Sequence, residues 1–272
     1  MIIGGKEFDV AGKTYIMGIL NCTPDSFSDG GKYLLVDSAM RHAEKMIKEG
    51  ADIIDVGGES TRPGYTVISA QEETERILPV IEKLKQQFDI VISVDTYKSE
   101  VAKNAIAAGA DMINDIWGLK YDGQMAKVIA KSGVACCLMH NRDIKKKPYQ
   151  ADIISEMLSD LQESIDRALE AGIQKDKLIT DPGVGFGKNY EENLMAIRHA
   201  DRLKELGCPV LLGTSRKSVI GLTLNLDSGQ RLEGTIATSV IGVTKGCSFI
   251  RVHDVLENKR AVRMTEAIMQ VS

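Results

Sequence analysis

The feature that most constrains the fold is a regular alternation of two kinds of apolar segment along the chain. Short runs rich in β-branched residues recur at 15–20, 52–56, 90–94, 112–116, 134–139, 178–180, 210–212 and 249–252. The longer segments between them carry apolar residues at spacings of three and four, which predicts amphipathic helices at 37–49, 70–87, 98–108, 122–132, 151–171, 189–206, 231–245 and 254–269. Glycines stand where most of these helices should end, at Gly50, Gly109, Gly133, Gly172, Gly207 and Gly246.

Eight strand–helix units with continuously apolar strands predict one domain over residues 1–272, an α/β fold of the (β/α)8 TIM barrel type. The alternative is an open doubly wound sheet, which needs a glycine-rich dinucleotide turn after its first strand. Segment 21–31 lacks the GxGxxG spacing, and this favours the barrel. Segment 8–14 predicts a short N-terminal β-hairpin that turns at Ala11-Gly12 and closes one end of the barrel.

Charge and cysteine usage exclude several classes of function. The 34 basic and 38 acidic residues give a net charge of −4, which argues against a general affinity for nucleic acid, so any anion site must be local. We expect a cytoplasmic protein, because no apolar run has the length of a membrane span or a signal peptide core. The five cysteines show no paired spacing, and Cys136 and Cys137 should point to opposite faces of one strand. The basic run 145–147 predicts a solvated loop without a role.

Polar side chains follow each predicted strand. They are Asn21, Asp55 with the segment 57–64, Asp95, Asn114 with Asp115, His140, Asp181 with the segment 182–188, the segment 213–218, and Arg251 with His253. One such carboxylate is explained by helix capping. Since the carboxyl ends of barrel strands meet at one mouth, polar groups at all eight ends predict a shared site there.

One side of this mouth is suited to an anion. Arg251 and His253 are two residues apart, so both project to the same face of the last strand, where they suit a phosphate or diphosphate. Asn21 arrives from the neighbouring first strand, and its carbonyl oxygen is a ligand type that Mg²⁺ uses beside substrate phosphates. The sequence leaves open that Arg251 instead pairs with a local acid and that His253 caps the last helix.

The other side is suited to a flat heterocycle such as a pterin or purine. Carboxylates accept from ring N–H groups, an amide does both, and a lysine donates, so Asp95, Asn114, Asp181 and Lys217 form a matching set. The alternative is that Asp95 and Asp181 cap the helices that follow them. Three glycines at 183, 185 and 187 indicate backbone close to a ligand, with Phe186 placed to lie against a ring.

Seven blocks of the sequence, in order, resemble the dihydropteroate synthases of folate biosynthesis. They are NCTPDSFSDGG, GADIIDVGGESTRPG, SVDT, INDI, DPGVGFGK, GTSRKS and RVH. The resemblance implies a TIM-barrel transferase, usually a homodimer, that is the target of sulfonamides. Such an enzyme joins 6-hydroxymethyl-7,8-dihydropterin diphosphate to p-aminobenzoate with Mg²⁺, and it releases 7,8-dihydropteroate and pyrophosphate.

The resemblance also implies roles for individual residues. The pterin would contact Asp95, Asn114, Asp181 and Lys217. The diphosphate and metal would contact Asn21, Arg251 and His253, with Thr61 on the same substrate. The p-aminobenzoate would contact Phe27, Arg62, Pro63 and Ser218. Of these, the catalytic set would be Asn21, Asp95, Lys217, Arg251 and His253. Segment 143–151 matches no motif.

The chemistry predicts a dissociative route, because an electron-rich pterin stabilises a cation at its methylene carbon while the diphosphate departs. The neutral arylamine needs position more than a base, and we assign no general base. We also predict that the loops around Phe27 and Pro63 close when the diphosphate is bound.

Two rival functions remain open at this level. A pterin-binding domain of a corrinoid-dependent methyltransferase would share the Asp/Asn/Asp wall but has no diphosphate to hold, so the segments 61–63 and 215–218 and the pair Arg251/His253 argue against it. A catalytically inactive homologue that acts as a scaffold would not need the complete anion-binding set.

Overall fold

The computed structural model describes residues 1–23, 32–60 and 66–271. A two-stranded antiparallel hairpin, β1 (Ile2–Ile3) and β2 (Lys6–Glu7), precedes the parallel strands. These are β3 (Tyr15–Asn21), β4 (Ile53–Gly57), β5 (Val91–Asp95), β6 (Met112–Asp115), β7 (Ala135–Met139), β8 (Leu178–Asp181), β9 (Leu211–Leu212) and β10 (Phe249–Val252). Each lies within about one residue of its predicted position.

The eight parallel strands form one sheet that curves into a nearly closed barrel. Their order is β8-β7-β6-β5-β4-β3-β10-β9, and a parallel bridge between Thr180 and Val210 joins the two outer strands. Thr180 N also donates to Pro209 O at 2.9 Å across this seam. The predicted TIM barrel is confirmed, and the doubly wound alternative is wrong.

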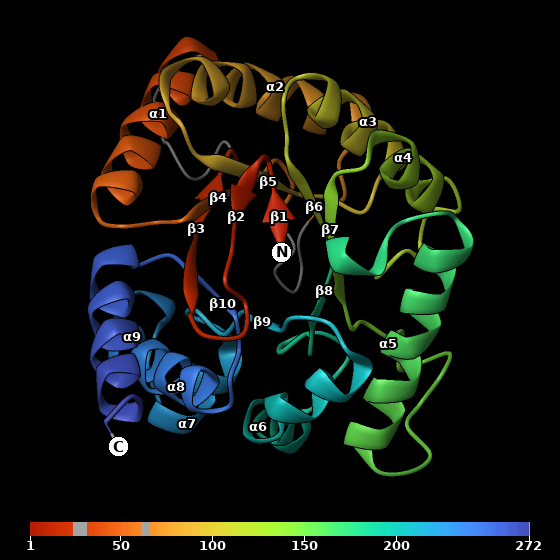
Figure 1. Cartoon of the computed structure of the whole chain (residues 1–272), viewed down its shortest axis with the longest axis vertical. Coiled ribbons are helices and arrows are strands. Elements are labelled where there is room, and N and C mark those ends of the chain that lie inside the picture. Colours follow the sequence, from red (N-terminus) through yellow and green to blue (C-terminus); the bar gives the residue numbers. More distant parts are fainter. Residues whose placement is uncertain (24–31, 61–65, 272) are drawn as a thin grey trace.

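Helices surround the strands on the outside (Figure 1). They are α1 (Lys32–Lys48), α2 (Ala70–Gln87), α3 (Ser99–Ala107), α4 (Met125–Ser132), α5 (Ile153–Glu170), α6 (Tyr190–Arg198), α7 (Ser218–Leu224), α8 (Leu232–Thr244) and α9 (Val255–Met269). In α2, Ser69 caps the first turn by accepting from Glu72 N at 3.1 Å, and the apolar stripe that includes Ile77 and Leu84 is buried. Among the described residues, none of the helices is long and apolar enough to cross a membrane.

Three helical predictions needed correction. The helix predicted at 37–49 begins earlier, at Lys32, and ends at Lys48. The segment 189–206 is not one helix, because α6 ends at Arg198 and a 3₁₀ helix, Ala200–Leu206, follows it. The short helix α7 was not predicted, since its seven residues follow a strand end directly and are too few to show helical periodicity. All six glycines expected to end helices have positive φ angles, which confirms that reading.

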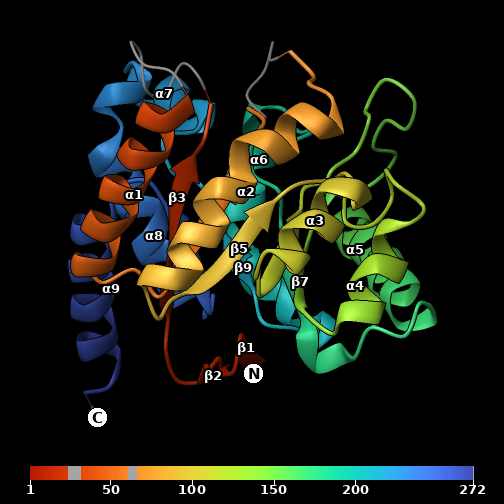
Figure 2. The same cartoon turned by 90° about the horizontal axis from the view of Figure 1, so that it is seen from above.

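The barrel interior is filled at one end by a layer of apolar side chains. Met17, Ile53, Val91, Met112, Cys137, Ile179, Leu211 and Phe249 form this layer together with Ile3 and Phe8. Ile3 and Phe8 come from the N-terminal hairpin region, which therefore closes this end; Figure 2 shows the hairpin opposite the end where α7 lies. The hairpin itself turns at Gly4-Gly5, so its predicted position at 8–14 was wrong. Gly4 and Gly5 have φ values of 56° and 79°, which suit glycine at the turn.

The second core lies between the strands and the helices, and Cys136 belongs to it while its neighbour Cys137 faces the barrel interior. All five cysteines are free and buried. The opposite orientation of the two adjacent cysteines is thus confirmed. Because side chains alternate along a strand, the apolar interior layer also fixes which residues face inward at the other end.

Candidate active site

The inward-facing positions change from apolar to polar at the carboxyl ends of the strands. Two residues beyond the apolar layer lie Asp55, Ser93, Asn114, Asp181 and Arg251, and a further step brings Asp95 and His253. The sequence-predicted residues Asn21, Asp95, Asn114, Asp181, Arg251 and His253 therefore all belong to the inward-facing set. This is a consequence of the two-residue strand period, since each lies an even number of residues from a buried interior side chain.

Three predicted residues lie in one row across four neighbouring strands. The strand register pairs Asn21 with Gly57, Gly57 with Asp95, and Asp95 with Asn114. Gly57 has no side chain in the middle of this row, and a Cβ built there would lie 3.9 Å from Asn21 Oδ1 and 4.0 Å from Asp95 Oδ2. The amide oxygen and the carboxylate thus face the same open space above Gly57.

Arg251 is held between two carboxylates. Its Nε donates to Asp55 Oδ2 at 2.6 Å, and its Nη2 donates to Asp95 Oδ2 at 2.6 Å. Asp55 Oδ2 also accepts from Asn114 Nδ2 at 3.3 Å. Burial opposes the charge of the guanidinium, but the carboxylates of Asp55 and Asp95 outweigh it and raise the pKa of Arg251. Of the two readings left open for Arg251, pairing with a local acid is the one observed.

Asp55 is the site residue that the sequence reasoning missed. The sequence places it at a polar strand end and predicts no role for it. Its side chain is fully buried at the level of Ser93, and it forms the floor beneath Arg251. A signal was present, because Asp55 is a charged residue inside the apolar run 52–56 and is two residues from both Ile53 and Gly57.

Several buried polar atoms of this floor have no hydrogen-bond partner among the described residues. They are Asp55 Oδ1, Ser93 Oγ, Asp95 Oδ1 and Asn114 Oδ1. Burial of an unsatisfied polar group is costly, so such a cluster indicates a place that a ligand completes. Three of the four atoms are carboxylate or amide oxygens, which accept hydrogen bonds, so the missing ligand should present N–H groups.

Burial also moves the ionisation of these carboxyl groups towards neutrality. It raises the pKa of Asp95 to about 7, against the lowering effect of the Arg251 guanidinium. It likewise raises the pKa of Asp181, although Lys217 and the N–H of Gly183 oppose the shift. Neither carboxylate caps a following helix. Asp122 accepts from Ser99 N at the start of α3, and Asn189 caps α6. The capping alternative for Asp95 and Asp181 is therefore wrong.

Lys217 lies on the far side of the mouth, at the N-terminus of α7. Its ammonium donates to Val184 O and lies 4.8 Å from the centre of the Phe186 ring. Burial lowers the pKa of Lys217 to about 8, while the nearby Asp181 carboxylate works in the opposite direction. Gly213 stands between Asp181 and Arg251, and a Cβ there would lie 3.7 Å from both side chains. Lys217, Phe186 and Asp181 thus share one side of the site.

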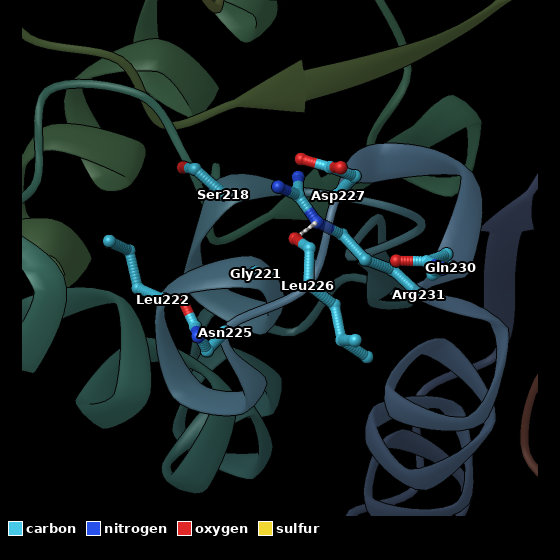
Figure 3. A pocket seen from close by; sticks show the side chains of 8 residues that line it. All are labelled: Ser218, Gly221, Leu222, Asn225, Leu226, Asp227, Gln230 and Arg231. Carbon is cyan, nitrogen blue, oxygen red and sulfur yellow. Dashed lines mark hydrogen bonds between the residues drawn. The ribbon is translucent and has the colours of Figure 1, made fainter.

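His253 and Ser218 lie at the rim. The Nδ1 atom of His253 is 2.9 Å from Ser215 Oγ, and that hydroxyl also accepts from His253 N at 3.1 Å. Ser218 is exposed and lines a cavity of about 280 Å³ between α7 and the start of α8 (Figure 3). This cavity also contains Asp227 and Arg231, and Arg231 Nε donates to Leu226 O at 3.0 Å.

The predicted residues Phe27, Thr61, Arg62 and Pro63, and with them the predicted closure of two loops, lie outside the described residues. The chain on either side of 61–65 is anchored by Lys98. Its ammonium donates to Glu59 Oε2 at 2.5 Å and to Ile68 O at 2.9 Å. Glu59 and Ile68, on either side of this part of the loop after β4, are therefore fixed next to the mouth.

The donor set at Asn21 fits a magnesium ion that is held mainly by its substrate. Within residues 1–23, 32–60 and 66–271, His, Cys, Asp and Glu side chains form no group of three or more that could hold a metal ion. A dedicated protein cage is thus not found there, whereas the Asn21 amide oxygen, near the position of a Gly57 Cβ, is a hard ligand of the type that Mg²⁺ accepts beside phosphate oxygens.

Comparisons with known proteins agree on one family. The family model described as "Pterin binding enzyme" matches residues 17–253. The dihydropteroate synthase of Clostridium beijerinckii is 58% identical over 271 residues, which cover 99% of this chain and 100% of the relative. The crystal structure of dihydropteroate synthase from Clostridium difficile, in the presence of pteroic acid, matches with a TM-score of 0.94 at 52% identity and covers 97% of this chain and 100% of that one. That of the Yersinia pestis enzyme, in a sulfonamide drug complex, matches with a TM-score of 0.92 at 42% identity and covers 100% and 99%.

Proposed function

Because the chain belongs to the pterin-binding enzyme family, as one of its dihydropteroate synthases, we propose that the barrel mouth binds the pterin diphosphate across the floor of Asp55, Asp95 and Asn114. The observation that carries this proposal is the cluster of unpartnered acceptors there. The dihydropterin ring presents N–H groups along its edge, and these would satisfy Asp95 Oδ1 and Asn114 Oδ1. Asp181 and Lys217 would hold the opposite edge of the ring, with Phe186 beside it.

The diphosphate would lie towards Arg251, His253 and Asn21. Arg251 keeps its Nε on Asp55, and its Nη groups are then available to phosphate oxygens in place of Asp95. His253 is fixed by Ser215 at the same rim. Asn21 would hold Mg²⁺, which when bound neutralises charge on the departing diphosphate. Thr61 would contact this substrate, and Phe27, Arg62, Pro63 and Ser218 the p-aminobenzoate.

In the reaction, the bond between the pterin methylene carbon and the diphosphate oxygen breaks, and its electron pair leaves with the diphosphate. Arg251 and His253 would stabilise that negative charge. Asp95 and Asp181 would stabilise the positive charge that develops on the ring. The arylamine nitrogen then bonds to the methylene carbon and loses one proton. The site needs to hold the two substrates in line and to exclude water rather than to supply a strong base.

The test is pyrophosphate release from the purified protein with both substrates and Mg²⁺. We expect release only when the pterin diphosphate and p-aminobenzoate are both present, with 7,8-dihydropteroate formed in equal amount. A corrinoid-dependent methyltransferase domain or an inactive scaffold would release none. Pyrophosphate release without p-aminobenzoate would indicate hydrolysis and would contradict the proposed transfer.

We also propose that the protein is a cytoplasmic homodimer. The free, buried cysteines support a reducing compartment. Large apolar side chains are exposed on the adjoining helices α6, α7 and α8, at Leu194, Leu222 and Ile241. Light scattering should give twice the mass of the chain, and the substitution Leu222→Glu should lower it, whereas a monomeric wild type would contradict the proposal.

A further inference from the structure

A buried cluster of charged side chains lies beside the site and is not used by the proposed chemistry. It centres on His140, which follows β7, and on Asp160 of α5, the helix beside that strand (Figure 1). The His140 ring is fully buried, and its Nε2 lies 3.2 Å from Asp160 Oδ2. Arg142 donates to the same oxygen through Nε at 2.8 Å and Nη2 at 2.6 Å, and Lys147 Nζ donates to Asp160 Oδ1 at 2.9 Å. The predicted solvated loop at 145–147 is confirmed, since the Lys147 side chain is 64% exposed, and its contact with Asp160 adds to that prediction.

The other nitrogen of His140 meets Lys188. Lys188 Nζ lies 2.7 Å from His140 Nδ1, 3.0 Å from Gly183 O and 3.1 Å from Phe186 O. An ammonium group has three N–H donors and no acceptor, so these three contacts satisfy it completely. The tautomer of the histidine follows from Asp160, because its carboxylate only accepts; Nε2–H therefore donates to Asp160 and Nδ1 accepts from Lys188. Burial lowers the pKa of His140 to about 3, in keeping with a neutral ring.

The three acceptors of Lys188 connect two loops of the mouth. Gly183 and Phe186 belong to the loop after β8, which turns through Gly183, Gly185 and Gly187, all with positive φ. A Cβ at Gly183 would lie 1.8 Å from His140 O, so this loop is packed directly on the one after β7. Lys188 therefore holds the carbonyl groups of Gly183 and Phe186, in its own loop, close to His140.

The same loop positions three predicted substrate contacts. Val184 O accepts from Lys217, the Phe186 ring lies against the Lys217 ammonium, and Gly183 N donates to Asp181 Oδ1 at 2.6 Å. We propose that His140 and Lys188 are positioning residues for the pterin side of the site: Lys188, held by the His140 acceptor, sets the loop conformation that places Lys217 and Phe186. This inference rests on the proposed function, because it concerns the pterin as the bound ligand.

The decisive variant is Lys188→Met, which removes the donors but keeps an unbranched side chain that is only one atom shorter. We expect the KM for the pterin diphosphate to rise about tenfold, which is equivalent to about 1.4 kcal/mol, with the KM for p-aminobenzoate and kcat within about twofold of wild type. Lys147→Met is the matched control. It removes another ammonium from the Asp160 cluster without touching the loop, so both KM values should stay unchanged.

Two substitutions of His140 separate its two nitrogens. His140→Asn places an amide oxygen near the position of Nδ1 and keeps an acceptor for Lys188, whereas His140→Gln places its amide near Nε2 and keeps only the contact with Asp160. We expect His140→Asn to retain a pterin KM close to wild type and His140→Gln to resemble Lys188→Met. Equal effects of the two substitutions, or an unchanged pterin KM in Lys188→Met, would overturn the inference.

Calorimetry with 6-hydroxymethylpterin tests the same step without catalysis, and Lys188→Met should bind it about tenfold more weakly. If the wild type binds this pterin but releases no pyrophosphate, the proposed function fails while the positioning role is still decided by the affinity of the variant. A proportional rise in both KM values, together with loss of thermal stability, would show a merely structural role and would also overturn the inference.

Discussion

The pairing of Arg251 with two buried carboxylates makes a specific prediction for the substitution Arg251→Lys. The guanidinium reaches Asp55 through Nε and Asp95 through Nη2, each at 2.6 Å, and its side chain is only 17% exposed. A lysine keeps the charge but has a single nitrogen, which cannot make both bonds in their present directions. One carboxylate therefore loses its charge-assisted hydrogen bond.

The loss of this hydrogen bond sets the expected change in the free energy of unfolding. A hydrogen bond to a charged group contributes about 1.5–3 kcal/mol, and full removal of one partner from a buried ion pair costs about 3–5 kcal/mol. Because one bond and the positive charge remain, we expect the free energy of unfolding to fall by about 2 kcal/mol at pH 8, which is above the pKa of about 7 of Asp95 in the wild type.

The difference in free energy of unfolding between Arg251→Lys and the wild type should be smaller at lower pH. Burial raises the pKa of Asp95 to about 7, and Arg251 limits this rise. A carboxyl group whose pKa is higher in the folded state stabilises the fold fully below its unfolded pKa of about 4, and this contribution is lost as the pH rises through the folded value. In Arg251→Lys the partner of Asp95 is weaker, so the pKa of Asp95 in the folded state is higher than in the wild type. The variant therefore continues to lose free energy of unfolding as the pH rises above 7. At pH 5.5 Asp95 is largely protonated in both proteins, and the difference should be below about 1 kcal/mol.

Urea denaturation at pH 5.5 and pH 8 measures both values. Arg216→Lys is the matched control, since Arg216 also makes two bonds to a carboxylate, at 3.0 Å and 2.5 Å to Asp254, but its side chain is 36% exposed. The free energy of unfolding of Arg216→Lys should be lower than that of the wild type by less than about 1 kcal/mol at either pH. An equal loss in Arg251→Lys at both pH values, or a loss no larger than that of Arg216→Lys, would refute the reasoning. We further expect kcat/KM to fall about 100-fold, because a donor to the leaving diphosphate is displaced.

Three further predictions concern the same end of the barrel. Since N–H groups of the pterin need an ionised acceptor, kcat/KM should rise with pH through an apparent pKa near 7. Asp95→Asn should flatten this rise in the pH profile. A pH profile identical to that of the wild type would exclude Asp95 as the group that titrates. Gly183→Ala should destabilise the protein by more than about 2 kcal/mol in urea denaturation, because its Cβ would lie 1.8 Å from His140 O, whereas Gly172→Ala, with open space around its Cβ, should show only the smaller cost of a positive φ. Asn21→Ala should raise the Mg²⁺ concentration needed for half-maximal activity without changing the free energy of unfolding by more than about 0.5 kcal/mol, and an unchanged Mg²⁺ dependence would contradict its role as a metal ligand.

The barrel was predictable because two local signals agree along the chain. Continuous apolar runs and three-to-four-residue periodicity depend only on neighbouring residues, and glycines marked where helices end. The hairpin was misplaced because both Gly4-Gly5 and Ala11-Gly12 are suitable turns, and the choice between them depends on Ile3 and Phe8 packing into the barrel end. Such long-range packing leaves no local signal.

The site was predictable to the extent that it follows from strand position. Polar residues at the ends of apolar strands must face one mouth, which is why Asp95, Asn114 and Arg251 lie together. Which of them pair could not be read from the sequence, because the Arg251 contacts join residues 196 and 156 positions apart. Asp55 was missed for the same reason: its importance depends on Arg251, which the sequence does not place near it.

The ion pair across the floor also has the polarity that the proposed reaction requires. The Arg251 guanidinium lies between the Asp55 and Asp95 carboxylates and limits the rise in the pKa of Asp95 that burial causes. When the methylene–diphosphate bond breaks, negative charge develops on the diphosphate and positive charge on the ring. If Arg251 turns to the diphosphate, it exchanges one anionic partner for another. If Asp95 turns to the ring, it exchanges one cationic partner for another. In the proposed reaction the charged groups would therefore exchange partners rather than lose them.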